Sequence, residues 1–196
     1  MSTLRTAATA AFLALTLVAC SALPTTTSAP SAATVATPPV LLVSLDGFRP
    51  DYLELGITPN LNRLAAGGVR AEWMNPSYPT LTFPNHYTVV TGLRPDHHGI
   101  IHNTISDPEL GEFSLGNRAA VADGRWWGGE PIWVGAENAG LKTATMFWPG
   151  SEAEIRGVRP TRWLPFDESL PVDARVDMML GWLGEPAATQ PRFETL

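Results

Sequence analysis

Apolar and polar residues alternate along the chain in blocks that predict short strands and helices in turn. Residues 40–45, Val-Leu-Leu-Val-Ser-Leu, form a nearly continuous apolar run, which is typical of a parallel strand buried on both faces. Residues 69–73 and 142–147 predict a second and a third strand. A further buried strand is expected to begin near the end of the sequence, at residues 192–196.

Capping residues and prolines predict helices between these strands. Thr58 as N-cap, Pro59 at the first helical position and two closing glycines predict a helix over residues 58–68. Residues 84–93, 131–138 and 172–183 predict three more helices. Strands that alternate with helices indicate an α/β domain with a mainly parallel sheet.

The first twenty residues follow a different pattern. A short basic region with Arg5 precedes an apolar stretch, and no acidic residue occurs before Asp46. This pattern predicts an export signal over residues 1–20, which is too short to span a membrane comfortably. Its last four residues, Leu-Val-Ala-Cys, resemble the lipobox of bacterial lipoproteins, which implies lipidation of Cys20. Ordinary signal cleavage is the alternative. Either way, we expect an exported protein, periplasmic or attached to the outer membrane through Cys20.

Residues 21–39 are rich in Pro, Ser and Thr and predict an extended tether, so the folded domain is expected to occupy residues 40–196. The whole chain has 196 residues and a net charge of −6, which argues against a surface built to wrap nucleic acid. With 44% hydrophobic residues it is too apolar for a disordered protein. Its single cysteine excludes an intramolecular disulfide and Cys-rich zinc modules.

Asp46 directly follows the first predicted strand. Ligands in parallel α/β sheets bind beyond the carboxyl ends of the strands, so Asp46 occupies a functional position. A carboxylate there costs desolvation energy unless a cation or hydrogen-bond donors satisfy it. Asp46 could equally cap the turn at Gly47, and position alone does not decide between these roles.

Thr82 lies in the segment Tyr-Pro-Thr-Leu-Thr-Phe-Pro-Asn-His of residues 78–86, at the predicted start of a helix. The free N–H groups and dipole of a helix N-terminus favour a phosphate beside it. Threonine is a weak nucleophile, but metal coordination can generate its alkoxide near neutral pH. The alternative is that Thr82 only caps the helix.

Several blocks together resemble the type I phosphodiesterase/nucleotide pyrophosphatase family of the alkaline-phosphatase superfamily, and its exported bacterial members above all. The blocks are residues 42–49, 78–93, 95–103, 107–108, 127–133 and 148–152. Their order and approximate spacing fit the family over residues 40–183. The resemblance implies an alkaline-phosphatase-like sheet with helices on both faces, of which this sequence would hold the N-terminal half.

The resemblance also implies roles for single residues. Asp46 matches a metal-binding aspartate, and Thr82 matches the nucleophile, which also contacts a metal. Asn103 matches the asparagine that binds a non-bridging phosphate oxygen. Phe83 and Phe166 match positions at which family members stack a nucleobase.

The implied reaction is hydrolysis of nucleotide phosphodiester or pyrophosphate bonds with release of a nucleoside monophosphate. The implied cofactors are two divalent metal ions, zinc by family habit, since oxygen ligands alone do not select zinc. The family's other ligands, two Asp-plus-His pairs and one further His, are expected beyond residue 183. We therefore expect residues 40–196 to be the N-terminal part of a catalytic domain, inactive without the rest, with a small nucleotide substrate and no protein partner.

Two other functions stay open. A related hydrolase of phosphonates or phosphomonoesters would use the same threonine chemistry, and a non-enzymatic remnant or binding module at the cell surface would use none. The four histidines, which lie between residues 86 and 102, show no metal-ligand spacing and are expected to be structural. The tryptophans are expected to form core and pocket wall, with Trp126, Trp127 and Trp133 packing the helix that starts at Pro131.

Overall fold

The structure, a computed structural model, describes residues 38–196. The predicted export signal (1–20), its Cys20 and nearly all of the predicted tether (21–39) lie outside the described residues. Within residues 38–196, none of the helices combines the length and the apolar character that crossing a membrane requires.

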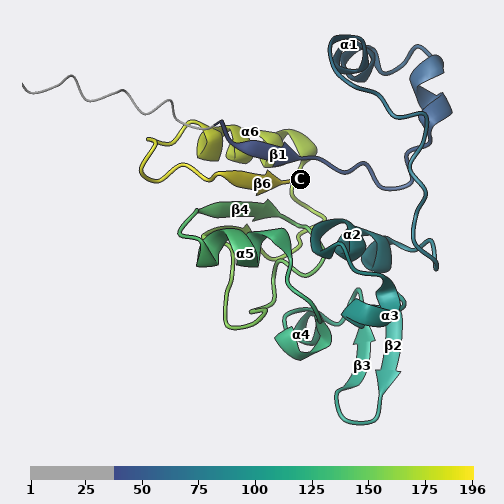
Figure 1. The fold of residues 1–196 in the computed structure, drawn as a ribbon, viewed down its shortest axis with the longest axis vertical. Helices are drawn as coiled ribbons and strands as arrows, with labels where there is room; N and C mark the ends of the chain where they lie inside the picture. The colour runs from purple at the N-terminus through teal and green to yellow at the C-terminus, as the bar shows by residue number, and fades with distance from the viewer. Residues whose placement is uncertain (1–37) are drawn as a thin grey trace, which may run out of the picture. The chain divides into compact units, whose positions relative to one another are not determined.

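The central feature of the fold is a four-stranded parallel sheet with the order β1-β6-β4-β5. Figure 1 shows β1, β6 and β4 side by side. Its strands are β1 (Val40–Leu42), β4 (Thr143–Met146), β5 (Arg162–Leu164) and β6 (Phe193–Thr195). The strand predicted from the last residues of the sequence is thus present as β6, and it lies between β1 and β4. The predicted α/β class with a mainly parallel sheet is confirmed.

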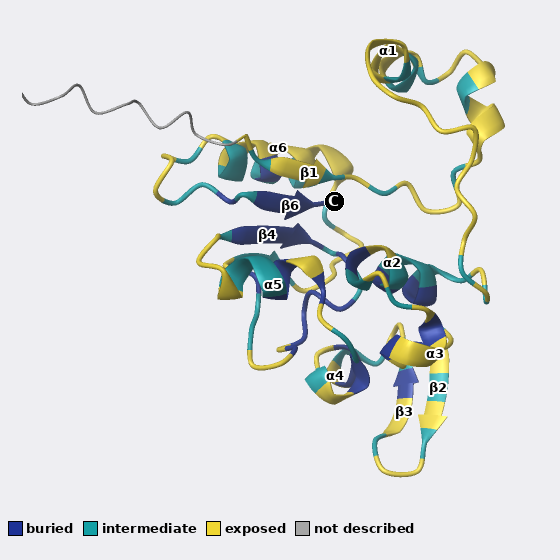
Figure 2. Cartoon of the chain, in the orientation of Figure 1, coloured by how far each residue is buried: buried dark blue, intermediate teal, exposed yellow. Residues whose placement is uncertain are grey.

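Burial differs sharply between the strands of this sheet. Every residue of β4 and β6 is buried, whereas β1 forms an edge with Val40 and Leu41 exposed (Figure 2). Leu41 and Ala144 both pair with Glu194 in the register of the sheet, so the three share one face. Backbone bonds continue from β1 to Ser44, whose N–H donates to Leu196.

Six α-helices and two 3₁₀-helices occur within residues 38–196. The α-helices are α1 (Pro59–Gly67), α2 (Thr82–Thr91), α3 (Pro95–His98), α4 (Arg118–Val121), α5 (Ile132–Asn138) and α6 (Val172–Leu183), and the 3₁₀-helices are η1 (Pro50–Glu54) and η2 (Gly124–Trp126). The predicted helix 172–183 is confirmed to the residue. Helix α2 ends at Thr91, earlier than predicted, because Gly92 adopts a left-handed conformation with φ 67°.

The predicted strand at residues 69–73 is wrong. This segment forms no strand, and Val69 is fully exposed and Trp73 58% exposed. Apolar side chains alone do not make a strand, since a strand also needs a partner for its backbone groups. The antiparallel hairpin of β2 (Thr104–Asp107) and β3 (Gly111–Ser114) was not predicted, because its four-residue strands carry no clear apolar alternation.

An aromatic core holds helix α2 in place. Tyr87 is fully buried, its hydroxyl donates to the carbonyl of Gly128 at 2.9 Å, and its ring packs edge-on against Trp127 at 4.9 Å. Trp126, Trp127 and Trp133 are all buried, as predicted for core residues. The start of α2, and with it Thr82, is therefore fixed by packing behind it.

Candidate active site

The site is built around Asp46 and Thr82, which the fold brings together across 36 residues of sequence. The Oγ1 of Thr82 donates a hydrogen bond to the Oδ2 of Asp46 at 2.9 Å. Asp46 follows β1 in a turn in which Gly47 has φ 70°, and Thr82 opens α2. The carboxyl end of a strand and the N-terminus of a helix thus supply one residue each.

Thr82 does not cap the helix. The N-cap is Leu81, which has extended backbone angles, and Thr82 is the first helical residue, with its side chain directed to Asp46. The capping interpretation of Thr82 is therefore wrong. The side chain of Asp46 likewise has Thr82 as its partner, so a role limited to capping the Gly47 turn does not describe it.

Asn103 approaches the same helix end from the chain before β2. Its Oδ1 accepts the backbone N–H of Phe83 at 3.0 Å. Because a carboxamide has its acceptor and donors on opposite branches, the Nδ2 of Asn103 is left to donate elsewhere. Pro84 has no N–H, so the helix offers a phosphate fewer backbone donors than an ordinary N-terminus would.

A cavity of about 550 Å³ opens beside Thr82. This volume falls within the usual range for small-molecule sites. Phe83 and Phe166 both line it, together with Asp46, so the predicted stacking residues and the predicted reactive pair meet in one cavity. Phe83 is almost fully buried against Phe113 and Trp127, whereas Phe166 is 48% exposed.

Phe166 lies on a loop that Arg175 of α6 holds together. The guanidinium of Arg175 donates to the carbonyl of Leu170 at 2.8 Å and lies over the ring of Phe147, 5.0 Å from its centroid. Phe147 in turn packs edge-on against Phe166 at 5.3 Å. An aromatic pair and a cation therefore form one wall of the cavity.

Another part of the wall is an ion pair that the sequence did not suggest. Arg118 of α4 donates to the carboxylate of Glu152, whose side chain is only 9% exposed. Both residues line the cavity, and the Arg118 guanidinium also lies 6.0 Å from the ring centroid of Phe166. The two cations of the cavity are thus already engaged by protein groups.

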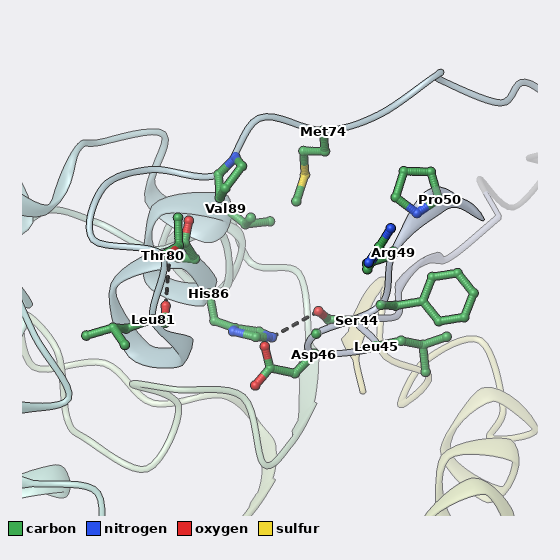
Figure 3. A pocket seen from close by; sticks show the side chains of 14 residues that line it. Ser44, Leu45, Asp46, Arg49, Pro50, Met74, Thr80, Leu81, His86 and Val89 are labelled. Carbon is green, nitrogen blue, oxygen red and sulfur yellow. Dashed lines mark hydrogen bonds between the residues drawn. The ribbon is translucent and has the colours of Figure 1, made fainter. Parts of the chain in front are cut away.

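His86 lines a second cavity of about 410 Å³ together with Asp46 (Figure 3). Its Nδ1 is 2.8 Å from the carbonyl oxygen of Thr82, and its Nε2 is 2.9 Å from the Oγ of Ser44. Ser44 and Asp46 line both cavities, as does His86. The cavities therefore meet at this group of side chains.

The other three histidines have local partners. His98 is buried, its Nδ1 accepts from Ile100, and burial lowers its pKa. His97 pairs with Asp96 at 3.0 Å on the surface. His102 accepts the backbone N–H of Thr104. These contacts agree with the structural role that we expected for them.

The described residues fit part of the ligand set of a metal site. Asp46 and Thr82 bring two oxygen atoms to 2.9 Å of each other, which matches the oxygen ligands that divalent cations accept. No group of three or more His, Cys, Asp or Glu side chains able to hold a metal ion occurs within residues 38–196. A complete two-ion centre is not formed by these residues.

Comparison with known proteins decides the family. Residues 40–196 match the type I phosphodiesterase/nucleotide pyrophosphatase family. The chain belongs to this family. The match begins at the first residue of β1 and includes Asp46, Thr82 and Asn103.

Curated relatives of the chain include snake-venom and mammalian proteins. A venom phosphodiesterase of Crotalus durissus collilineatus is 50% identical over 161 residues, which cover 81% of this chain and 19% of that protein. Ectonucleotide pyrophosphatase/phosphodiesterase family member 3 of Mus musculus is 44% identical over 162 residues, or 81% of this chain and 18% of that protein. The chain thus spans only about a fifth of the length of these relatives.

Solved structures of murine ectonucleotide pyrophosphatase/phosphodiesterase 5 share the fold. An inactive threonine-to-alanine variant in complex with AMP is 34% identical, with a TM-score of 0.76 over 82% of this chain and 42% of that chain. The unsubstituted murine protein is 36% identical, with a TM-score of 0.75 over 81% of this chain and 42% of that chain. Both likenesses confirm the alkaline-phosphatase-like arrangement of sheet and helices.

Proposed function

We propose that the chain carries the nucleophile and the nucleotide pocket of a metal-dependent hydrolase of nucleotide phosphodiester or pyrophosphate bonds. The observation that carries this proposal is the pair of Thr82 and Asp46, joined at 2.9 Å at the mouth of a cavity lined by Phe83 and Phe166. Membership in the family supports it, as does the AMP complex of an inactive threonine variant among the structural neighbours.

The reaction proceeds in two displacements. The Oγ1 of Thr82 attacks the α-phosphorus, the bond from phosphorus to the leaving oxygen breaks on the opposite side, and the proton that the hydroxyl gives up ends on the departing group. Water then attacks the same phosphorus, the bond to Thr82 breaks, one proton of the water restores the Thr82 hydroxyl, and a nucleoside monophosphate is released. The Nδ2 of Asn103 donates to a non-bridging oxygen, on which charge increases in each transition state.

A divalent cation held by the Asp46 carboxylate and the Thr82 hydroxyl would lower the pKa of that hydroxyl and neutralise charge on the phosphate. Asp46 also orients the hydroxyl directly, since its carboxylate accepts a hydrogen bond from the Thr82 hydroxyl. Zinc as the ion remains part of this proposal. So does the inactivity of the 196-residue chain by itself, because residues 38–196 contain no group of three or more His, Cys, Asp or Glu side chains able to hold a metal ion.

The aromatic walls favour a substrate that carries a base. Stacking on an aromatic ring contributes about 1–3 kcal/mol per base. Arg118 donates to Glu152 and Arg175 to backbone carbonyls, which reduces the donors that they offer to the extra oxygens of a monoester. This arrangement favours a nucleotide diester over the phosphomonoester alternative. Export, with lipidation at Cys20, is proposed alongside it on the sequence alone.

The test compares two substrates in protein expressed from the complete open reading frame that contains this chain. With zinc present, a nucleoside p-nitrophenyl diester should be hydrolysed faster than p-nitrophenyl phosphate, and equal or faster monoester turnover would favour the alternative. Thr82→Ala should abolish diester turnover, whereas Thr82→Ser should retain part of it. If no zinc is bound and neither ester is hydrolysed, the non-enzymatic alternative is favoured.

A further inference from the structure

His86 is not among the residues that the family resemblance implies for the reaction, yet it contacts the backbone of Thr82 and the segment between β1 and Asp46. It lies one helical turn after Thr82 on α2, and its ring faces Ser44, two residues before Asp46 (Figure 3). The contact with Ser44 joins positions 42 residues apart.

The partners of the ring determine which nitrogen carries the hydrogen. The oxygen of Thr82 is a carbonyl oxygen and can only accept, so the Nδ1 of His86 must be the donor of the 2.8 Å bond. In a neutral imidazole the other nitrogen is then an acceptor, so the hydroxyl of Ser44 donates to Nε2 at 2.9 Å. Both bonds therefore run in one direction, from Ser44 through His86 to Thr82.

The ring has little freedom to leave this position. It packs edge-on against Trp148 at a centroid distance of 5.2 Å, and the Nε1 of Trp148 donates to the backbone carbonyl of His86. Trp148 is 2% exposed. A buried side chain thus packs behind the bridge between Ser44 and α2.

We propose that His86 is a positioning residue, which sets the separation of Asp46 and Thr82 by tying Ser44 to the first carbonyl of α2. The proposal rests on the proposed function, since it assumes that Thr82 is the nucleophile. Asp46 is exposed and lies in a turn beyond the last residue paired in the sheet, so its own contacts hold it only through Thr82. The bridge through His86 adds to the backbone bond from Ser44 to Leu196, and the ring of His86 packs against Trp148 rather than against Phe83 or Phe166.

Two variants remove the bond between Ser44 and His86, one from each side. His86→Asn keeps a donor at the place of Nδ1 and loses the bond to Ser44, and Ser44→Ala removes the same bond from the other side with a smaller change. Both should lower kcat by about 10- to 100-fold, because misplacement of a reacting atom by about 1 Å costs up to that much. The KM for a nucleoside p-nitrophenyl diester should stay within about twofold, since the two rings proposed to stack the base, Phe83 and Phe166, are unchanged.

Two controls make the result specific. His97→Asn makes the same chemical change on the surface, where His97 is 66% exposed, and should leave kcat and KM unchanged. The double variant that combines His86→Asn with Ser44→Ala should lose no more than either single variant, because both substitutions remove one and the same bond. Additive losses, or a loss confined to KM, would overturn the proposal.

A readout without metal or turnover tests the bridge itself. In ¹⁵N spectra of histidine-labelled, metal-free protein at about pH 8, where an ordinary imidazole is neutral, His86 should be the tautomer with hydrogen on Nδ1. Ser44→Ala should shift only the Nε2 resonance of His86. Hydrogen on Nε2 would overturn the proposal, because the ring could not then donate to Thr82.

The kinetic outcomes also separate this proposal from the proposed function. If Thr82→Ala abolishes turnover but His86→Asn and Ser44→Ala do not reduce kcat, the positioning role is wrong and the nucleophile assignment stands. If Thr82→Ala retains full turnover, both are wrong.

Discussion

The backbone N–H of Phe83 donates to the Oδ1 of Asn103 at 3.0 Å, and this one bond orients the asparagine beside the first turn of α2. With its oxygen turned to the helix, the amide group must present its Nδ2 hydrogens to the other side. The Phe83 N–H is therefore used by Asn103, and the Nδ2 of Asn103 becomes a side-chain donor beside the start of the helix.

This arrangement predicts that Asn103→Asp is far more harmful to activity than to stability. The aspartate keeps an oxygen for the Phe83 N–H but loses the donor and adds a negative charge beside the phosphate. We expect kcat to fall by about 10²- to 10³-fold, as for loss of a donor to transition-state charge. Steady-state kinetics on protein from the complete open reading frame provide the measurement.

Asn103→Ala is the matched control for that prediction. It removes the acceptor as well as the donor, so it should lower kcat similarly and also destabilise the fold, by about 1 kcal/mol for one lost hydrogen bond. If Asn103→Asp keeps normal turnover, Asn103 does not act on the phosphate.

The aromatic wall predicts a change in KM. Phe166→Ala removes an exposed ring from the cavity, and we expect the KM of a nucleoside diester to rise about tenfold, since base stacking is worth about 1–3 kcal/mol. Arg175→Ala should raise KM by less, because it loosens the loop behind Phe166 rather than removing the ring. Measuring both variants with a diester that lacks a base checks the assignment, because there the two should match the unsubstituted enzyme.

Asp46 and Thr82, the proposed reactive pair, could be singled out from the sequence because their signals are local. Asp46 follows an apolar run, and Thr82 precedes a proline-marked helix, so each residue's place was evident from its own segment. That the two touch required the family resemblance, and the structure now gives the distance. The exact bounds of helix 172–183 were predictable for the same reason, since a proline precedes it and a glycine follows it.

What was missed depends on contacts between distant segments. Arg118 and Glu152 lie 34 residues apart, one on a four-residue helix and one in a loop, and neither segment has a pattern that marks a pocket wall. His86 was judged by metal-ligand spacing, which says nothing about a bridge to Ser44. The apolar residues of segment 69–73 predict a strand, but Val69 and Trp73 are exposed, since apolar side chains also occur on the surface.

Replacement of Glu137, near the end of α5, should cause a large loss of stability. Its Oε1 accepts from the N–H and the hydroxyl of Thr143 at the start of β4 and from the N–H of Thr161, and its Oε2 accepts from the Thr161 hydroxyl. One carboxylate therefore ties a helix to the starts of two strands. Glu137→Ala should lower the free energy of unfolding by about 3 kcal/mol, since hydrogen bonds to a charged group contribute about 1.5–3 kcal/mol each and are not additive.

Denaturant unfolding of the unsubstituted protein and the variant measures this loss. Glu109→Ala is the control, because Glu109 is exposed on the turn between β2 and β3 and its replacement should change the free energy of unfolding by less than about 0.5 kcal/mol. Equal effects at the two positions would show that the Glu137 bonds contribute nothing net.

The buried carboxyl group of Glu194 should make the stability of the fold depend on pH. It is fully buried in the centre of the sheet, and neither carboxylate oxygen has a hydrogen-bond partner within residues 38–196. Burial, with a smaller contribution from the charge of Glu185, raises the pKa of Glu194 to about 7. The folded state therefore binds a proton that the unfolded state releases near pH 4.5, so this group's contribution to stability falls as the pH rises from about 4.5 to about 7.

Replacing the carboxyl group by a neutral amide should remove that slope. The free energy of unfolding of Glu194→Gln, minus that of the unsubstituted protein, should increase by on the order of 2 kcal/mol between about pH 4.5 and pH 8. His98, whose pKa is lowered by burial, contributes an opposite slope below about pH 6.5, but both proteins share it and it cancels in the difference. Denaturant unfolding at several pH values gives both curves. A difference that stays constant over this range would mean that Glu194 titrates alike in the folded and unfolded chain, and that some group satisfies it.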